Sequence, residues 1–151
     1  MIFYIDASAV LAVVGDEAAS LAVDRIVRSP EASIVISDFA IAESSAVLAR
    51  DGRVGRWAGD EMERLYRDLD TWTLGVGEKS EITPTDIADA TAFIRLPGVT
   101  LRAPDAIHIA AAQRVGATIL TLDRGMARAA DLLGVPCINP AGADAPGDLK
   151  D

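Results

Sequence analysis

The chain has 151 residues, of which 50% are hydrophobic, and its 23 acidic and 14 basic side chains give a formal net charge of −9 at pH 7. This size and composition indicate one globular domain, and the single cysteine excludes an internal disulfide and suits a reducing compartment such as the cytoplasm. No apolar run approaches the roughly 18 residues that span a membrane, and the negative charge argues against broad, sequence-indifferent binding of nucleic acid.

Short apolar runs and amphipathic stretches alternate along the chain. Runs without a polar residue suit strands that are buried on both faces of a parallel sheet, whereas apolar residues at a spacing of three or four suit helices. In chain order we expect a strand at 2–5, helices at 9–14 and 16–28, a strand at 33–36, a helix pair at 38–50 and 54–72, a strand at 81–83, helices at 84–94 and 104–115, a strand at 117–122, a helix at 125–133 and an edge strand at 135–138. Residues 1–140 are expected to form the domain, and 141–151 a flexible C-terminal tail.

This alternation predicts an α/β domain with a mostly parallel central sheet of about four to five short strands flanked by helices. Ligands of such sheets bind outside the carboxyl ends of the strands. Asp6 directly follows the first expected strand, and Asp123 directly follows the strand at 117–122. The sequence therefore predicts two carboxylates at the ligand-binding edge of the sheet. Ser8, two residues after Asp6, is suited to cap the first helix.

Two further acids lie on expected helices. Asp105 follows Pro104, whose ring suits the first helical position, so the acid falls in the first turn, where the helix dipole alone favours it by roughly 0.3 to 1 kcal/mol. Glu43 lies one residue from the apolar stripe of the helix at 38–50, and it is either a plain helix acid or part of a site. For His108, one turn after Asp105, we favour a packed or hydrogen-bonded structural histidine over a site residue.

A shared location for these four acids would require a cation. Two carboxylates about 4 Å apart repel each other by ~1 kcal/mol in water and by ~4 kcal/mol at an effective dielectric constant of about 20. One histidine and one cysteine argue against a zinc site, whereas carboxylate oxygens suit Mg²⁺ or Mn²⁺. Such a metal can activate water toward a phosphodiester. The residues therefore predict hydrolysis of a phosphate ester.

Four segments, YIDASA, IAESSAVLAR, APDAIHIAAA and ILTLDRGMARAA, resemble in order and spacing the motifs of PIN-domain ribonucleases, particularly the VapC-like toxins of toxin-antitoxin systems. The resemblance covers nearly the whole chain and implies a single PIN-like domain, Mg²⁺ or Mn²⁺, an RNA substrate, an antitoxin partner and a homodimer. It assigns the catalytic and metal-binding roles to Asp6, Glu43, Asp105 and Asp123. Ser8 and Thr121 match small hydroxyl positions that lie beside the acids.

The combined interpretation is a metal-dependent endoribonuclease that acts as the toxin of a toxin-antitoxin pair. Asp6, Asp105 and Asp123 are expected to bind the metal, Glu43 to complete or tune the site, and a metal-activated water to attack the RNA phosphate. Arg124 and Arg128, close to Asp123 in sequence, are candidates for holding substrate phosphates. An arginine-rich antitoxin segment would suit the negative toxin and could block the carboxylates.

Two alternatives stay open. One is a catalytically silent PIN-like module that acts only by binding its antitoxin. The other is an aspartate-based phosphatase or phosphotransfer domain with a strand-end aspartate as nucleophile. Against the second, a haloacid-dehalogenase-like enzyme would carry an aspartate where this chain has Ser8, and a receiver domain would need a lysine after a late strand, whereas the two lysines are Lys79 and Lys150.

Overall fold

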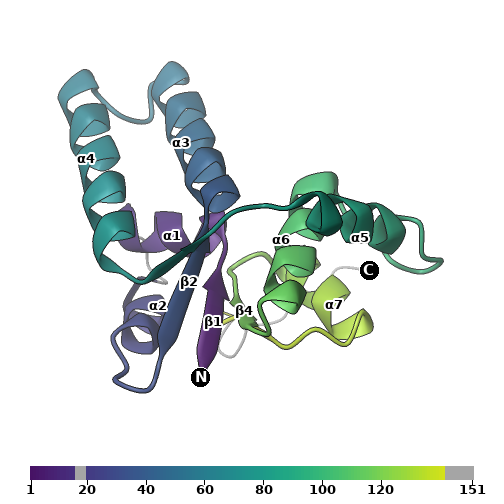
Figure 1. Ribbon diagram of the computed structural model, residues 1–151. Helices are drawn as coiled ribbons and strands as arrows, with labels where there is room; N and C mark the ends of the chain where they lie inside the picture. Colours follow the sequence, from purple (N-terminus) through teal and green to yellow (C-terminus); the bar gives the residue numbers. More distant parts are fainter. Residues whose placement is uncertain (16–19, 142–151) are drawn as a thin grey trace, which may run out of the picture.

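The computed structural model describes residues 1–15 and 20–141, and it shows an α/β domain with a five-stranded sheet (Figure 1). The strands are β1 (Ile2–Ile5), β2 (Ser33–Ser37), β3 (Glu78–Ser80), β4 (Thr118–Leu120) and β5 (Cys137–Ile138). The helices are α1 (Ala7–Val14), α2 (Ser20–Val27), α3 (Asp38–Arg53), α4 (Gly59–Gly75), α5 (Pro84–Ile94), α6 (Ala103–Arg114) and α7 (Arg124–Leu132). Every strand pairing is parallel, in the order β3-β2-β1-β4-β5, so the predicted fold class is confirmed.

Both faces of the sheet are covered by helices (Figure 1). Successive side chains of a strand point to opposite faces, and β1 shows the consequence. Phe3 and Ile5 join the core beneath α1 to α4, whereas Tyr4 between them joins the core beneath α6 and α7. The wholly apolar strands of the sequence are explained by this double burial. Within the described ranges, no helix is long and apolar enough to cross a membrane.

The start of α5 agrees with its sequence signature. Thr83 caps the helix, its hydroxyl accepting from the Asp86 amide, while Asp86 accepts from the Thr83 amide at 2.8 Å. The fully buried Asp86 also accepts two hydrogen bonds from Arg114 of α6, the shorter at 2.7 Å from Nε. Burial alone raises the pKa of Asp86, but the hydrogen bonds from Arg114 and Thr83 lower it overall. This ion pair fastens α5 to α6.

The α3–α4 turn falls later than the sequence predicted. We expected the helix to end at residue 50, but α3 continues through Asp51 and Gly52 to Arg53. The Asp51 carboxylate accepts from Arg56 at 3.0 Å, and the chain reverses at Gly55, whose φ of +75° only glycine adopts readily. The expected helix start at residue 54 was therefore wrong, although the predicted antiparallel pair of helices is present (Figure 1).

The third strand is also displaced from its predicted position. It pairs with β2 at Glu78–Ser80 rather than at 81–83. Gly77 allows the close approach, since a Cβ there would lie 2.1 Å from the carbonyl oxygen of Ile34. Other boundaries move by a few residues, because β4 and β5 are shorter than expected and α7 begins at Arg124. The helix expected at 16–28 lies partly, and the tail at 141–151 almost wholly, outside the described residues.

Candidate active site

Asp6 lies at the carboxyl end of the central strand β1 and is 4% exposed. It is the N-cap of α1, with its Oδ1 accepting from the Ala9 amide at 3.0 Å. Our expectation that Ser8 caps this helix was wrong, because the helix begins directly after the strand and Ser8 falls inside its first turn. Burial raises the pKa of Asp6, although the Ala9 hydrogen bond and the hydroxyls of Thr121 and Ser8 oppose that shift.

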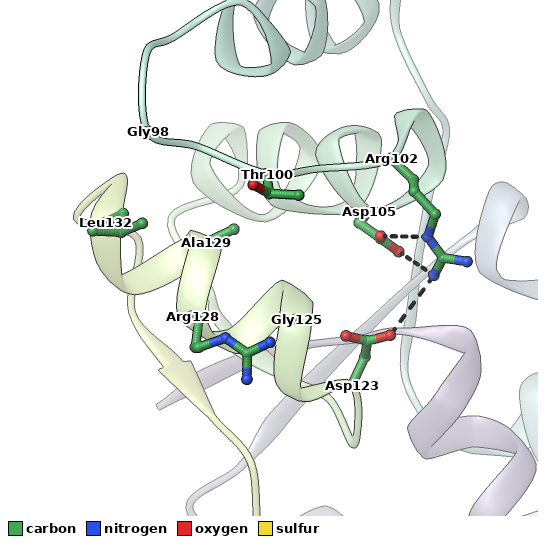
Figure 2. Close-up of a pocket in the computed structure, with 9 residues that line it drawn as sticks. All are labelled: Gly98, Thr100, Arg102, Asp105, Asp123, Gly125, Arg128, Ala129 and Leu132. Carbon is green, nitrogen blue, oxygen red and sulfur yellow. Dashed lines mark hydrogen bonds and ion pairs between the residues drawn. The ribbon is translucent and has the colours of Figure 1, made fainter. Parts of the chain in front are cut away.

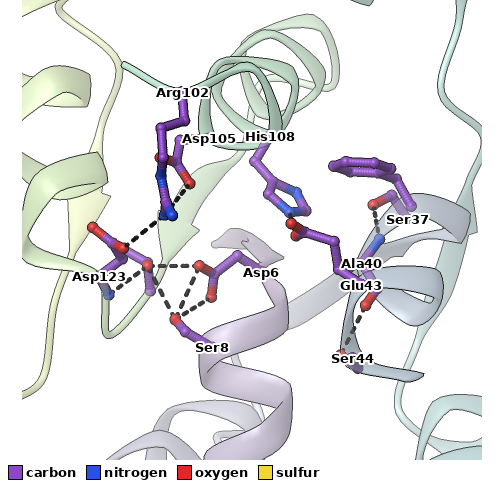
Figure 3. Close-up of polar contacts among 12 residues, drawn as sticks. Asp6, Ser8, Ser37, Ala40, Glu43, Ser44, Arg102, Asp105, His108 and Asp123 are labelled. Carbon is purple, nitrogen blue, oxygen red and sulfur yellow. Dashed lines mark hydrogen bonds and ion pairs between the residues drawn. The ribbon is translucent and has the colours of Figure 1, made fainter. Parts of the chain in front are cut away.

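Two hydroxyl groups join Asp6 to the segment after β4 (Figure 3). Thr121 Oγ1 donates to Asp6 Oδ2 at 2.7 Å and accepts from the Asp123 amide at 2.9 Å. Ser8 Oγ donates to Asp6 Oδ1 at 2.8 Å and accepts from the Leu122 amide at 2.8 Å. The two strand ends that carry Asp6 and Asp123 are therefore held in register by side chains as well as by the β1–β4 pairing.

Asp105 and Asp123 share a single cation, the guanidinium of Arg102 (Figure 2). Arg102 Nε donates to Asp105 Oδ2 at 3.1 Å, and a terminal nitrogen lies 3.7 Å from Asp123 Oδ2. Asp123 also caps α7 by accepting from the Met126 amide at 2.8 Å. The hydrogen bond with Asp105 and the charges of Asp105, Asp123 and Glu43 raise the pKa of Arg102. Two of the four predicted acids thus pair with one positive group.

Glu43 is held by the only histidine. His108 Nε2 and Glu43 Oε2 are 2.7 Å apart, within hydrogen-bond distance. On the other side of the ring, Nδ1 lies 2.9 Å from the Tyr4 hydroxyl, which donates to Ser37 Oγ at 2.7 Å. His108 is 2% exposed. The favoured structural reading of this histidine fits its packing, but one of its hydrogen-bond partners is a predicted site acid.

The four acids do not form a preassembled metal cage. Among residues 1–15 and 20–141, no group of three or more histidine, cysteine, aspartate or glutamate side chains is arranged to hold a metal ion. Each acid instead has a protein partner: hydroxyls for Asp6, His108 for Glu43, and Arg102 for Asp105 and Asp123. The donor set nevertheless suits a hard divalent cation, because its atoms are carboxylate oxygens and two of the acids already share one cation.

The shared cation lies in a pocket of about 470 Å³ whose lining includes Arg102, Asp105, Asp123 and Arg128 (Figure 2). Of the two arginines proposed for substrate phosphates, Arg128 lines this pocket and Arg124 does not. Sequence reasoning missed Arg102. Its spacing of three residues before Asp105 is the signal that could have suggested the pairing, since residues three apart meet on a helical turn.

Comparison with known proteins gives one family match. The family profile described as PIN domain matches residues 3–132. No curated protein sequence matches the chain closely enough to count as a relative.

Solved structures of similar fold share few residues with this chain. FitAcB from Neisseria gonorrhoeae has 20% identity, a TM-score of 0.67, and coverage of 94% of this chain and 99% of that chain. For VapBC2 from Rickettsia felis, bound to a promoter DNA fragment, the identity is 14%, the TM-score 0.67, and the coverage 91% and 98%. VapC20 from Mycobacterium tuberculosis, described as a sarcin-ricin loop cleaving toxin, has 16% identity, a TM-score of 0.63, and coverage of 84% and 94%. At these identities the likeness establishes the fold.

Proposed function

Because the chain belongs to the PIN domain family, whose profile spans residues 3–132, we propose that it is a metal-dependent endoribonuclease and the toxin of a toxin-antitoxin pair. The observation that carries the proposal is the pairing of Asp105 and Asp123 with one cation, Arg102. Asp6 is tied to the same place through Thr121. The similarity of fold to VapC20, described as a sarcin-ricin loop cleaving toxin, supports RNA as the substrate.

In this proposal Asp6, Asp105 and Asp123 bind Mg²⁺ or Mn²⁺, with Glu43 completing the ligand set. When bound, the metal supplies an activated water and stabilises negative charge on the phosphate. The hydroxyls of Ser8 and Thr121 favour the charged form of Asp6 against the effect of its burial. Arg128, in the wall of the pocket beside Asp123, is placed to pair with a phosphate oxygen of the substrate.

The partners are part of the same proposal. An antitoxin that presents an arginine would compete for the position that Arg102 occupies between Asp105 and Asp123, and would thereby keep the carboxylates from a metal. We also propose a homodimer and a cytoplasmic location, as the resemblance to VapC-like toxins implies. The catalytically silent alternative differs in one respect only, since it predicts antitoxin binding without cleavage.

The deciding experiment is RNA cleavage by protein that has been separated from its antitoxin. Cleavage is expected with Mg²⁺ or Mn²⁺ and is expected to stop with a chelator. Asp6→Asn and Asp105→Asn should each lose more than the roughly 10- to 100-fold that removal of an outer-shell partner costs. Equal cleavage by the wild type and Asp6→Asn would identify a contaminating nuclease. A metal-bound protein that cleaves no RNA would favour the silent module.

A further inference from the structure

His108 is a buried histidine to which the proposed metal site assigns no role. It lies on α6, one turn after Asp105, and is 2% exposed. Two aromatic rings pack against it, with the ring centroid of Phe39 at 5.1 Å and that of Tyr4 at 5.7 Å. Buried polar groups are normally hydrogen-bonded, and both ring nitrogens of His108 lie within hydrogen-bond distance of a partner. Packing and polar contacts therefore fix the orientation of the imidazole.

The polar contacts of His108 belong to a chain that begins and ends on α3. Ser37, the N-cap of α3, accepts from the Ala40 amide at 3.0 Å and from the Tyr4 hydroxyl at 2.7 Å. The Tyr4 hydroxyl lies 2.9 Å from His108 Nδ1, and His108 Nε2 lies 2.7 Å from Glu43 Oε2. We call this the Ser37–Glu43 chain, and its members are Ser37, Tyr4, His108 and Glu43. Because Ser37 and Tyr4 are fully buried, the inner part of the chain is shielded from water.

Glu43 differs from two of the site aspartates in how its carboxylate is held. Asp6 and Asp123 are short side chains that cap the helices they precede. Glu43 lies inside α3, where no free helix amide can hold it, and its longer side chain loses conformational freedom when it is ordered. The Glu43 side chain is 31% exposed, and among the described residues its hydrogen-bond partner is His108. The orientation of the Glu43 carboxylate therefore depends on His108.

The contact also joins two of the predicted site acids. Asp105 and His108 are three positions apart on α6 and therefore lie on one side of that helix. Figure 3 shows the Glu43 side chain reaching from α3 to the His108 ring. The contact thus holds an acid of α3 against the helix that carries Asp105. A small divalent cation needs its ligands in nearly ideal positions, so a fixed Glu43 would favour metal binding.

We propose that His108 is a positioning residue of the metal site: supported by Tyr4 and Ser37, it orients the Glu43 carboxylate as a metal ligand. The proposal rests on the metal-dependent function proposed above. It adds to that function a role for the buried histidine, which acts through Glu43 and touches neither metal nor substrate. Without His108, the metal itself would have to order the Glu43 side chain, and metal binding would be weaker.

Two amide substitutions separate the two nitrogens of the imidazole. Glutamine places its amide nitrogen near the position of Nε2 and can donate to Glu43, whereas the shorter asparagine places its amide near Nδ1 and falls short of Glu43. We expect His108→Asn to weaken Mn²⁺ binding in calorimetric titration by about 10- to 100-fold, as loss of an outer-shell partner does, and His108→Gln to stay within about threefold of the wild type. Equal losses for the two variants would overturn the proposal.

Glu43→Gln shows whether His108 acts through Glu43. If it does, His108→Asn should weaken Mn²⁺ binding when Glu43 is present and change it by less than about twofold in the Glu43→Gln background. A loss of the same size in both backgrounds would show that His108 affects the metal by another route, and it would refute the positioning role.

Tyr4→Phe gives a reading that does not depend on the folding of His108→Asn. It keeps the buried ring and removes the hydroxyl beside Nδ1, and it should weaken Mn²⁺ binding by about two- to tenfold, the equivalent of one hydrogen bond. Wild-type affinity in this variant would contradict the proposal. Circular dichroism verifies that each variant is folded.

The matched control for lost stability is Thr73→Val on α4. Thr73 is 3% exposed and donates to the carbonyl oxygen of Asp70 at 3.1 Å, outside the Ser37–Glu43 chain. This variant should unfold more easily and bind Mn²⁺ as the wild type does. If it lost as much affinity as His108→Asn, the losses would reflect stability alone and the proposal would fail.

The outcome separates this inference from the function on which it rests. If His108→Asn weakens Mn²⁺ binding and His108→Gln does not, but the wild type cleaves no RNA, the positioning role stands and the nuclease proposal fails. If the wild type cleaves RNA with Mn²⁺ but both His108 variants bind Mn²⁺ as tightly as the wild type, the nuclease stands and the positioning role fails.

Discussion

Replacement of Thr121 by valine tests how the hydroxyls support the candidate site. Thr121 is fully buried, and valine has nearly its shape but no hydroxyl. The substitution removes the hydrogen bond to Asp6 Oδ2 at 2.7 Å and leaves the Asp123 amide without its acceptor at 2.9 Å. The two strand-end acids would then lose the side chain that joins them.

The size of the effect follows from the two hydrogen bonds. A hydrogen bond to a charged group contributes about 1.5 to 3 kcal/mol, and an unpaired buried N–H costs about 1 to 3 kcal/mol. The second contribution belongs near its lower limit, because the Asp123 side chain is 35% exposed and water can approach. We therefore expect Thr121→Val to lower the free energy of unfolding by about 2 to 4 kcal/mol.

Urea unfolding followed by circular dichroism measures this loss. With an m-value of about 2 kcal/mol per M, the midpoint should fall by about 1 to 2 M. Thr121→Ser is the matched control, because it keeps the hydroxyl and removes one methyl group, a loss of about 1 kcal/mol. A valine variant within about 0.5 kcal/mol of the wild type would show that the hydroxyl does not support the site in this way.

Three other predictions concern charged groups. Arg114→Leu should lower the free energy of unfolding by about 3 to 5 kcal/mol, because it leaves the buried Asp86 carboxylate without its ion-pair partner. A loss below about 1 kcal/mol in urea unfolding would contradict this prediction. Folding raises the pKa of Asp6, so the contribution of Asp6 to stability is present at low pH and is lost as the pH rises through the folded pKa. Asp6→Asn should therefore be more stable than the wild type at neutral pH while it loses activity. A melting temperature equal to or lower than that of the wild type would refute this prediction. Arg102→Gln should bind Mn²⁺ more tightly, because no cation then competes for Asp105, and calorimetric titration showing unchanged or weaker binding would count against a shared metal site.

Much of the fold could be predicted because it is encoded locally. Apolar runs define strands that are buried on both faces, and the cap at Thr83 can be predicted from four consecutive residues. The proximity of Asp6 and Asp123 could also be predicted, because the strands that precede them are parallel and therefore end at one edge.

What was missed depends on contacts between distant residues. The position of β3 follows from the approach of Gly77 to Ile34, which no local pattern reveals. Glu43 and His108 are 65 positions apart, so their hydrogen bond could not be predicted from either helix alone. The prediction that Ser8 caps α1 failed for a different reason. Asp6 and Ser8 are both good capping residues, and only the direct strand-to-helix junction decides between them.

The caps of α1 and α7 use carboxylate oxygens that the proposed metal site would also need. Asp6 and Asp123 each accept a helix amide on Oδ1, from Ala9 and Met126 respectively, and Asp6 Oδ2 accepts from Thr121. A cation bound by both oxygens of either acid would have to share Oδ1 with the amide that caps the helix. Ca²⁺ takes six to eight oxygens and often a bidentate carboxylate, whereas Mg²⁺ keeps several waters and accepts single oxygens at shorter range. In the proposed site, the caps of α1 and α7 would therefore favour the smaller cation.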